Sequence, residues 1–436
     1  MSRFIYNLFL PFGLLFFLPD LILKYRRRGG WKSTYRERFG FYGNRKAELK
    51  ACRGAIWVHS VSVGETVVAL SMIKQYLKRF PDKKFILSTT TTTGQDVARA
   101  NCPENVKVIF CPIDFPWMVR RALRLIKPSA LVIFETEIWP NLVSISADKG
   151  IPVMLVNGRM SDHSAAGYRK FSKIFFSSLL RKFSLIMTQT EVDAERYLSV
   201  SPLADVVVGG NMKFDQQIPQ ISDRNVLLDY FGGGDEPLVL FGASTHPGEE
   251  ELLVKCFVEL KKDFPNLKLV LVPRHAERAD DVAQIIETNN LSYVRRSKSS
   301  AATGVEVLLG DTTGEMMLLL QGADVVVMGK SFAGHDEGHN LIEPALLGKA
   351  VVTGMVLRNF RYILKALVAD SAILQANDAE LCMTLRNLLE SAKLREELGK
   401  RAFDAISAHR GATDRAIDAL ENLLSAEKDI RSKQNQ

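Results

Sequence analysis

Short apolar runs alternate with helical patterns along most of the chain, starting at residue 55. Each run is rich in Val, Ile, Leu and Phe, which is typical of strands that are buried on both faces. Strands and helices in alternation predict a parallel sheet with helices on both sides. In the first half the predicted strands are 55–58, 84–87, 106–110, 130–134, 152–156 and 185–188. The predicted helices between them are 66–80, 94–100, 117–126, 139–149 and 192–198.

The pattern stops at residues 206–225, where glycines and a proline interrupt it, and then starts again. This repetition predicts two α/β domains of similar construction. Predicted strands of the second half are 238–241, 268–272, 293–294, 306–309, 324–328 and 350–353, with helices at 249–264, 279–288 and within 376–428. The expected divisions are an N-terminal hydrophobic segment with a basic flank (1–29), a first α/β domain (30–208), a linker (209–225), a second α/β domain (226–400) and a C-terminal helix and tail (401–436).

Residues 4–23 are hydrophobic, although Asn7, Pro11, Pro19 and Asp20 interrupt them. A membrane-spanning helix needs roughly 20 mostly apolar residues, so the length is borderline. No small-residue cleavage site precedes the basic residues that follow, which disfavours a cleaved signal. Those basic residues stand at positions 24, 26, 27, 28, 32, 36 and 38. We expect an uncleaved anchor that spans once or lies in the interface, with the chain on the cytoplasmic side; a core helix with a basic cap is the alternative.

The composition is that of a folded globular chain. Of 436 residues, 47% are hydrophobic and 24% are charged, which excludes a disordered chain and a multi-span membrane protein. The formal net charge is +8, because 57 Lys and Arg outnumber 49 Asp and Glu. Basic residues are not interleaved with aromatic ones in a recognisable module, so we expect no nucleic-acid partner. Five scattered cysteines without metal-ligand spacing fit a reducing compartment.

Candidate chemistry lies in the loops after the predicted strands, because ligands of open parallel sheets bind beyond the carboxyl ends of the strands. The first strand ends in HSVSVGE (59–65), where Ser62 precedes Gly64, which permits a tight turn, and Glu65 begins a helix. Glu65 either caps that helix or acts as a general base for an acceptor hydroxyl. The fourth strand ends in FETEIWPN, where Glu137 either starts the next helix or faces the same site.

Loops of the second half favour an anionic ligand. The segment FGAST (241–245) exposes main-chain N–H groups before a helix, which can hold a phosphate. Arg274, within PRH, can grip a phosphate or carboxylate through two hydrogen bonds; alternatively, Arg274 and His275 are simply solvated. A further loop, GDTTGEM, contains Gly314 and Glu315.

The longest loop spans residues 329–344 and contains His335 and His339. Histidines four apart on a helix would indicate a metal, but Asp336 occupies the place where the zinc motif needs glutamate, and flanking glycines favour a loop. We therefore expect no metal. Polar contacts near a helix start are the preferred interpretation, and they would involve His339, Asn340 and Glu343. A carboxylate one turn into that helix can accept hydrogen bonds from two vicinal hydroxyls, as in a ribose.

Taken together, these loops resemble the 3-deoxy-D-manno-octulosonic acid (Kdo) transferases of bacterial lipopolysaccharide synthesis, in order and over nearly the whole chain. The resemblance implies an α/β fold of GT-B type, in which two Rossmann-like domains, an acceptor domain and a CMP-Kdo-binding domain, face a central cleft, with an N-terminal membrane-anchor helix. It implies transfer of Kdo from CMP-Kdo to a lipid A precursor of lipid IVA type, at the cytoplasmic face of the inner membrane, without metal or cofactor. The segments that carry it are HSVSVGE (59–65), STTTTTG (88–94), FETEIWPN (134–141), NGRMSDHS (157–164), GNMKFD (210–215), PRH (273–275) and GHNLIEPA (338–345).

Individual roles also follow from the resemblance. Glu65 would be the general base, and Glu137 a cleft carboxylate that matters for activity. The residues implied to hold the donor are Arg274, Lys213, Gly314, Glu315, Asn340 and Glu343. Other residues implied to line the cleft are Ser62, Gly64, His275, Gly338 and His339. Two departures stand out: the family usually has Gly-Gly-Ser where this chain has Lys330 in the middle, and Gly-Pro-His where it has Gly354-Met355-Val356.

The residues alone leave two other functions open. A GT-B enzyme with a different donor, such as a UDP-sugar, would share the fold and the ribose-binding glutamate. A non-catalytic protein that binds an anionic membrane surface would use the basic N-terminal segment and the net charge. Transfer by direct displacement with one base predicts inversion of the anomeric centre. The phosphate and carboxylate of CMP-Kdo agree with the cationic residues in the second half.

Overall fold

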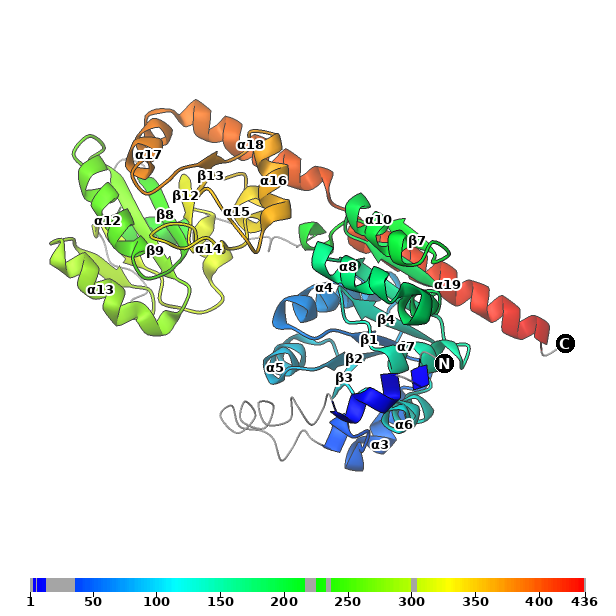
Figure 1. Ribbon diagram of the computed structural model, residues 1–436. Coiled ribbons are helices and arrows are strands. Elements are labelled where there is room, and N and C mark those ends of the chain that lie inside the picture. Colours follow the sequence, from blue (N-terminus) through cyan, green and yellow to red (C-terminus); the bar gives the residue numbers. More distant parts are fainter. Residues whose placement is uncertain are drawn as a thin grey trace. The chain divides into compact units, whose positions relative to one another are not determined.

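The computed structural model describes residues 3–4, 6–12, 36–215, 225–232, 237–298 and 304–434. The chain divides into two compact units: Met1–Asp215 with Arg410–Gln436 form the first, and Gln216–His409 forms the second (Figure 1). The first boundary falls inside the predicted linker. The predicted C-terminal segment, 401–436, is divided between the units: residues 401–409 belong to the second unit and residues 410–436 to the first.

A seven-stranded parallel sheet forms the centre of the first unit, in the order β3-β2-β1-β4-β5-β6-β7. From β1 the chain runs first to one side of the sheet, through β2 and β3, and then to the other side, from β4 to β7. The place where β1 and β4 diverge is therefore the topological switch point, where ligands of such sheets bind. The strands are β1 (Ile56–His59), β2 (Phe85–Thr89), β3 (Val106–Phe110), β4 (Ala130–Phe134), β5 (Val153–Gly158), β6 (Leu185–Thr188) and β7 (Val206–Val208).

Both faces of this sheet are covered, as the apolar runs predict. Ile56 and Val58 belong to one buried core cluster and Trp57 to the other, because successive side chains of a strand point to opposite faces. The helices that cover it are α3 (Lys46–Ala51), α4 (Val63–Arg79), α5 (Thr92–Asn101), α6 (Pro116–Ile126), α7 (Pro140–Ala147), α8 (Asp162–Lys170), α9 (Ser177–Leu180), α10 (Glu191–Val200) and α19 (Ala412–Gln434). Short turns of helix lie at η1 (Gly43–Arg45), η2 (Ser172–Phe176) and η3 (Met212–Asp215).

Hydroxyl side chains begin several helices that follow strands in the first unit. Ser62, Thr91, Ser161 and Thr190 are N-caps, and each side-chain oxygen accepts the N–H three residues later. In a parallel sheet the strand ends and these helix starts meet at one edge. The caps therefore fix the loops that carry the candidate chemistry.

The second unit repeats the arrangement with a second parallel sheet, in the order β10-β11-β9-β8-β12-β13-β14. Its switch point lies between β8 and β12. The strands are β8 (Leu238–Thr245), β9 (Leu267–Pro273), β10 (Tyr293–Arg295), β11 (Val307–Leu309), β12 (Val325–Met328), β13 (Ala350–Thr353) and β14 (Leu374–Gln375). The prediction of two α/β domains with parallel sheets is confirmed.

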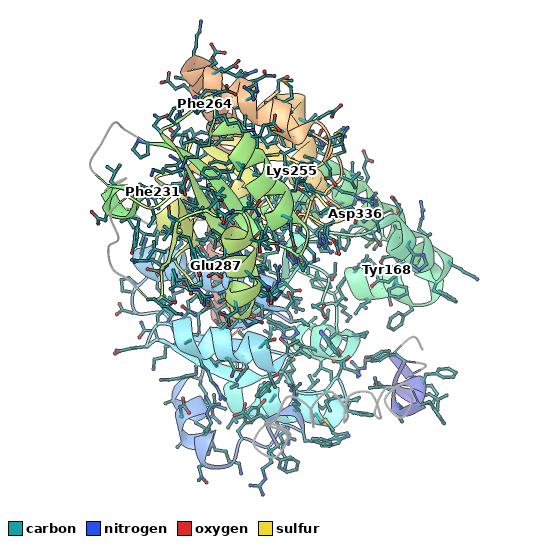
Figure 2. All side chains as sticks on the ribbon, turned by 90° about the vertical axis from the view of Figure 1, so that its left-hand side faces the viewer. Tyr168, Phe231, Lys255, Phe264, Glu287 and Asp336 are labelled. Atoms are coloured by element: carbon teal, nitrogen blue, oxygen red, sulfur yellow. The ribbon has the colours of Figure 1, made fainter. Side chains whose placement is uncertain are left out.

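Helices also cover the second sheet. Figure 2 labels Lys255 on α12 and Glu287 on α13, two helices that pack with α17 in one core cluster. The helices are α11 (Asn225–Phe231), α12 (Glu249–Leu260), α13 (Ala279–Thr288), α14 (Met316–Leu320), α15 (Ile342–Leu346), α16 (Arg361–Ala369), α17 (Leu381–Glu390) and α18 (Ala392–Ala408), with a 3₁₀ turn at η4 (Ala276–Arg278).

Helix α19 completes the core of the first unit although it comes last in the chain. The carboxylate of Asp215 accepts the N–H groups of Gly411 (2.6 Å) and Thr413 (2.5 Å), which fixes the start of the helix. Further along, Ile417 and Leu420 are buried in the core cluster that contains residues of α4 and β1. The apolar contacts of α19 thus explain why the division by contacts assigns it to the first unit.

The N-terminal residues 6–12 are helical and contact the first unit. The Tyr6 hydroxyl donates to Asp114 Oδ2 (3.0 Å), and Asn141 Nδ2 donates to Asn7 Oδ1 (2.6 Å). The apolar side chains in this region that are exposed are Phe4, Leu8, Phe9 and Phe12.

A spanning N-terminal anchor has no support within the described residues. In those parts of the chain, no helix has the length and apolar character needed to cross a bilayer. Residues 13–35, which contain much of the predicted anchor and most of its basic flank, lie outside the described residues.

Replacing Ile417 with alanine is expected to lower the free energy of unfolding of the first unit by about 2–4 kcal/mol, since the side chain is 0% exposed. All four tryptophans, at positions 31, 57, 117 and 139, precede Asp215, so urea denaturation followed by tryptophan fluorescence reports on this unit. The control is Asn422→Ala, at an exposed position of α19, with an expected change below about 0.5 kcal/mol. Equal midpoints for the two variants would contradict the placement of α19 in this core.

Candidate functional site

Glu65 lies at the switch point of the first sheet, in the first turn of α4 directly after β1. Its Oε2 accepts the main-chain N–H of Val61 (2.7 Å), and its Oε1 accepts the hydroxyl of Ser62 (3.0 Å). Ser62 Oγ in turn accepts the N–H of Glu65 (3.2 Å), so the two residues cap the helix reciprocally. The residue is 8% exposed. The capping geometry is therefore observed, and it holds the carboxylate in one orientation at the carboxyl edge of the sheet.

Gly64 stands beside this cap, but the tight turn does not depend on a glycine conformation. Its φ lies outside the left-handed region, and a Cβ at this position would meet nothing closer than Ser62 Oγ at 4.0 Å. The glycine therefore leaves space next to Glu65 and is not required by the backbone.

Glu135 and Glu137 follow β4, the strand beside β1 at the switch point. Burial raises the pKa of Glu137 to about 7, and the negative charge of Glu65 contributes to the shift. Burial also raises the pKa of Glu65, with a contribution from Glu135, while the hydrogen bonds from Val61 and Ser62 oppose it. The charges of Glu65 and Glu135 thus disfavour the ionised form of Glu137, and Glu137 takes up a proton near neutral pH.

Glu135 is paired with cations from neighbouring loops. Lys213 Nζ lies 3.0 Å from its Oε1, and Arg159 Nε lies 3.9 Å from its Oε2. Asn157 Nδ2 lies 3.5 Å from Oε1, and Asn157 Oδ1 accepts the N–H of Met212 (3.0 Å). Glu135 and Asn157 have left-handed backbones, with φ of 55° and 54°, a conformation that asparagine adopts readily but that costs Glu135 about 1 kcal/mol. Lys213, predicted to hold the donor, is thus fixed in the first unit against Glu135.

Histidines gather at the switch point of the second sheet. His246 follows β8, and its Nε2 lies 3.0 Å from Nε2 of His339, in the loop after β12. The rings of His335 and His275 lie 5.5 Å and 6.0 Å from that of His246. Burial lowers the pKa of His246 and of His339 to about 4, and nearby positive charges, Lys330 among them, add to the shift. Both rings are therefore neutral at pH 7, and one nitrogen donates while the other accepts.

Arg274 and His275 lie beside this histidine pair and are exposed. The N–H of Arg274 donates to the carbonyl of Thr245 (3.0 Å), which ties the end of β9 to the end of β8. The guanidinium charge of Arg274 contributes to the lowered pKa of His339. The structure thus brings together three of the predicted residues, Arg274, His275 and His339. Across the described residues, no group of three or more His, Cys, Asp or Glu side chains is arranged to hold a metal ion.

The loop between β12 and α15, together with the first turn of that helix, contains three further predicted site residues: Gly338, Asn340 and Glu343. Gly338 has a φ of 72°, and a Cβ there would lie 2.4 Å from the Leu357 side chain, so only glycine fits. Asn340 Oδ1 accepts the N–H of Ile342 (3.1 Å), and its Nδ2 donates to Glu343 Oε1 (3.1 Å). Asn340 therefore orients Glu343 at the start of α15.

Glu315 is already paired within the second unit. Arg296 Nη2 lies 2.9 Å from its Oε1, and the Thr312 hydroxyl also donates to the carboxylate. These partners, Arg296 first, hold the pKa of Glu315 below its usual range. Gly314, just before it, has a φ of 89°. A ligand that used Glu315 would have to share it with Arg296.

Three residues at the two switch points were not among the predicted site residues: Glu135, His246 and Glu249. Glu135 stood inside a motif, but its left-handed backbone and its lysine partner have no local signature. His246 meets a histidine 93 residues later, and periodicity cannot indicate such a contact. The sequence predicted only that Glu249 begins a helix, and gave no sign that its carboxylate accepts hydrogen bonds from a second loop.

Solved structures with a similar fold include MurG of Acinetobacter baumannii, with a TM-score of 0.53 and 14% identity, over 85% of this chain and 99% of that one. A UDP-GlcNAc 2-epimerase from Neisseria meningitidis gives a TM-score of 0.55 and 12% identity, over 85% and 100%. At these identities the likeness shows the fold alone. The fold is GT-B-like, with two parallel sheets in an α/β arrangement.

Sequence comparison identifies the family. Residues 33–216 match the family described as 3-deoxy-D-manno-octulosonic-acid transferase (kdotransferase). The chain is 32% identical over 399 residues to the 3-deoxy-D-manno-octulosonic acid transferase of Haemophilus influenzae, which covers 90% of this chain and 92% of that protein. It is 33% identical over 414 residues to the transferase of the same name in Bordetella pertussis, covering 92% and 94%. The chain therefore belongs to the Kdo transferase family of glycosyltransferases, which confirms the resemblance.

Replacing Glu137 with glutamine is expected to change the pH dependence of the first unit's stability. A carboxyl group whose pKa rises from 4.5 to about 7 on folding binds more protons in the folded state than in the unfolded state between those values. Its contribution to wild-type stability therefore falls as the pH rises through this window, and glutamine removes that loss. The urea midpoint of Glu137→Gln relative to wild type, followed by tryptophan fluorescence, should be higher at pH 8 than at pH 5.

The control for this comparison is Glu104→Gln, at an exposed carboxyl group of the same unit. Its difference from wild type should be nearly the same at both pH values. A pH-independent difference for Glu137→Gln would contradict the raised pKa.

Proposed function

We propose that the protein transfers Kdo from CMP-Kdo to a lipid A precursor, with Glu65 as the general base. The observation that carries this proposal is the geometry of Glu65, whose carboxylate is oriented by Val61 and Ser62 at a switch point. Membership of the Kdo transferase family supplies the reaction class. The donor and acceptor are those that the family resemblance implies.

The environment of Glu65 suits proton abstraction from a sugar hydroxyl. Each of its oxygens accepts one hydrogen bond, and a carboxylate oxygen has capacity for a second. Burial raises its pKa, which brings the base closer to the working pH and makes it a better proton acceptor. The neighbouring Glu137, with a pKa of about 7, is a place to which the proton can pass.

The second unit suits the anionic donor. Arg274 is exposed beside the neutral pair of His246 and His339, and Lys330 adds a second positive charge there. These groups can bind the phosphate and carboxylate of CMP-Kdo and stabilise the CMP that leaves. Asn340 holds Glu343 at the start of α15, where its carboxylate can accept the ribose hydroxyls. For Lys213 we keep the role implied by the resemblance, a contact to the donor anion.

The transfer is a single displacement in this proposal. The acceptor oxygen forms a bond to the anomeric carbon while the bond from that carbon to the phosphate oxygen breaks, and CMP leaves with the electron pair. Glu65 receives the proton of the acceptor hydroxyl. One displacement without a covalent intermediate inverts the anomeric centre, and NMR of the product linkage would identify retention if it occurs.

Glu65→Gln is expected to lower kcat by about 100- to 10,000-fold, because glutamine keeps the shape and the cap but cannot take a proton. The KM for CMP-Kdo should change little. The measurement is CMP release together with mass spectrometry of the lipid product, for CMP-Kdo and for UDP-sugars. Turnover with UDP-sugars and none with CMP-Kdo would favour the alternative donor class.

Asp193→Asn is the matched control for Glu65→Gln. Asp193 occupies the same position in the cap of α10, where its N–H donates to Thr190 Oγ1 (3.1 Å) and its Oδ1 accepts the N–H of Met160 (2.9 Å). This variant makes the same carboxylate-to-amide change in a helix cap and should keep wild-type kcat. An unchanged kcat in Glu65→Gln would remove Glu65 as the base, and no turnover by wild type with any donor would favour a binding protein.

A membrane lipid as acceptor calls for association with the cytoplasmic face of the inner membrane, which we also propose. The exposed Phe9 and Phe12 are suited to the interface of a bilayer, and the basic residues that follow suit anionic headgroups. We expect the double variant Phe9→Ser, Phe12→Ser to float less with vesicles that contain anionic lipid. Equal flotation of wild type and variant would contradict a role for these two residues. Equal flotation of the wild type with anionic and with neutral vesicles would contradict a role for anionic headgroups.

A further inference from the structure

The buried carboxylate of Glu249 accepts four main-chain N–H groups in the second unit. Oε2 accepts from His246 (2.8 Å) and Lys330 (2.8 Å), and Oε1 accepts from Ser331 (2.9 Å) and Phe332 (2.9 Å). The residue is only 2% exposed. A buried carboxylate is costly unless its hydrogen bonds are satisfied, and here main-chain groups fill both oxygens.

These four bonds cross the switch point of the sheet. Glu249 and His246 follow β8, whereas the other three donors are consecutive residues after β12. The two strands are neighbours in the sheet, so one side chain holds the ends of both. The loop is close to β8 as well, since a Cβ on Gly329 would lie 2.2 Å from the carbonyl oxygen of Ser244.

The loop could not keep this shape without support. Lys330 has a φ of 60°, a left-handed conformation that costs a non-glycine residue about 1 kcal/mol. Its N–H donates to Glu249, and its carbonyl accepts the N–H of Gly338 (2.7 Å). Ser331 extends the connection, because its hydroxyl donates to Met328 O (2.6 Å) and accepts the N–H of Gly354 (3.0 Å).

The residues held in this way include a lysine and a histidine of the pair at this switch point. The Lys330 side chain is 28% exposed and its Nζ lies 3.6 Å from Glu337 Oε1, and its charge acts on both His246 and His339. His246, whose N–H is the fourth donor to Glu249, contacts His339 at 3.0 Å. Asp336, labelled in Figure 2, lies in the same loop and pairs with Arg358 (2.5 Å).

We propose that Glu249 is a positioning residue for donor binding: it sets Lys330 and the His246–His339 pair in the arrangement that receives the donor phosphate. This inference rests on the proposed function. Glu249 itself does not touch the donor, because its oxygens are occupied by the N–H groups of the two loops. Lys330 gives the arrangement a cation where the family usually has glycine.

The alternative is that Glu249 stabilises the fold and has no effect on donor binding. A fold-stabilising residue lowers the temperature of unfolding when it is replaced, but it leaves ligand affinity unchanged in the molecules that remain folded. A positioning residue changes donor affinity at temperatures where the variant is fully folded. A rise in the KM for the donor without a rise in the KM for the acceptor therefore distinguishes a positioning residue from one that only stabilises the fold.

The test uses the full-length protein, with CMP as the probe in titration calorimetry and CMP-Kdo in kinetics. In Glu249→Gln, one oxygen becomes an NH₂ group that faces two main-chain donors, so the loop must shift. We expect the Kd for CMP and the KM for CMP-Kdo to rise at least about tenfold, while the KM for the lipid acceptor stays within about twofold. The matched control is Glu306→Gln, a carboxylate that accepts the N–H of Ser292 (2.9 Å) at the start of β11. It should leave CMP affinity unchanged.

A second variant keeps the inference testable if Glu249→Gln does not fold. Lys330→Gly fits a φ of 60° and removes the ammonium, so it should also weaken CMP binding about tenfold. Wild-type affinity in Lys330→Gly, or in a folded Glu249→Gln, would overturn the inference and leave the proposed function intact. Equal weakening by Glu249→Gln and Glu306→Gln would also overturn it. No binding of CMP and no turnover of CMP-Kdo by wild type would overturn the proposed function itself.

Discussion

Both parallel sheets depend on one interaction at the carboxyl ends of their strands: a side-chain carboxylate accepts hydrogen bonds from main-chain N–H groups. In a parallel sheet every strand ends at the same edge, and the helices that follow leave unpaired N–H groups there. The chain meets this constraint repeatedly with acidic side chains. Asp114 accepts from Asn141 and Leu142 (both 2.8 Å), and Asp193 accepts from Met160 (2.9 Å). The loops at these edges therefore keep a defined shape without regular secondary structure.

Glu65 and Glu249 occupy corresponding places, in the first turn of the helix after the first strand of each sheet along the chain. Their surroundings give them different properties. Glu65 accepts two hydrogen bonds, both from its own turn, and keeps capacity for another partner. Glu249 accepts four, three of them from the loop after the neighbouring strand. One position in a common architecture thus supplies a carboxylate with unused hydrogen-bonding capacity in one unit and a carboxylate filled by main-chain N–H groups in the other.

The sequence indicated the architecture because each strand and helix has a local pattern. The predicted helix 279–288 coincides with α13, and the predicted strand 106–110 coincides with β3. Short edge strands were harder: β7 was read as the end of a pattern and β14 was not predicted, since edge strands are short and only partly buried. The return of the last helix to the first unit depends on contacts between distant segments, and no local pattern encodes them.

The candidate site was predictable only in part, for the same reason. Glu65 and Arg274 could be found because each follows a recognisable strand. The pair of His246 and His339 could not, because it joins two loops across the sheet. The left-handed backbones of Glu135 and Lys330 were also hidden, since glycine is the residue that normally marks such conformations.

The path of the chain through the two units has a consequence for biosynthesis. The first unit contains both the beginning of the chain and its last helix, so the second unit is an insertion within it. During translation, the second unit can fold as soon as it leaves the ribosome, but the first must wait for Ile417 and Leu420 to close its core. Until then the residues of α4 in this core cluster lack their contacts with α19. The part of the chain that is synthesised first is therefore the part whose core is completed last.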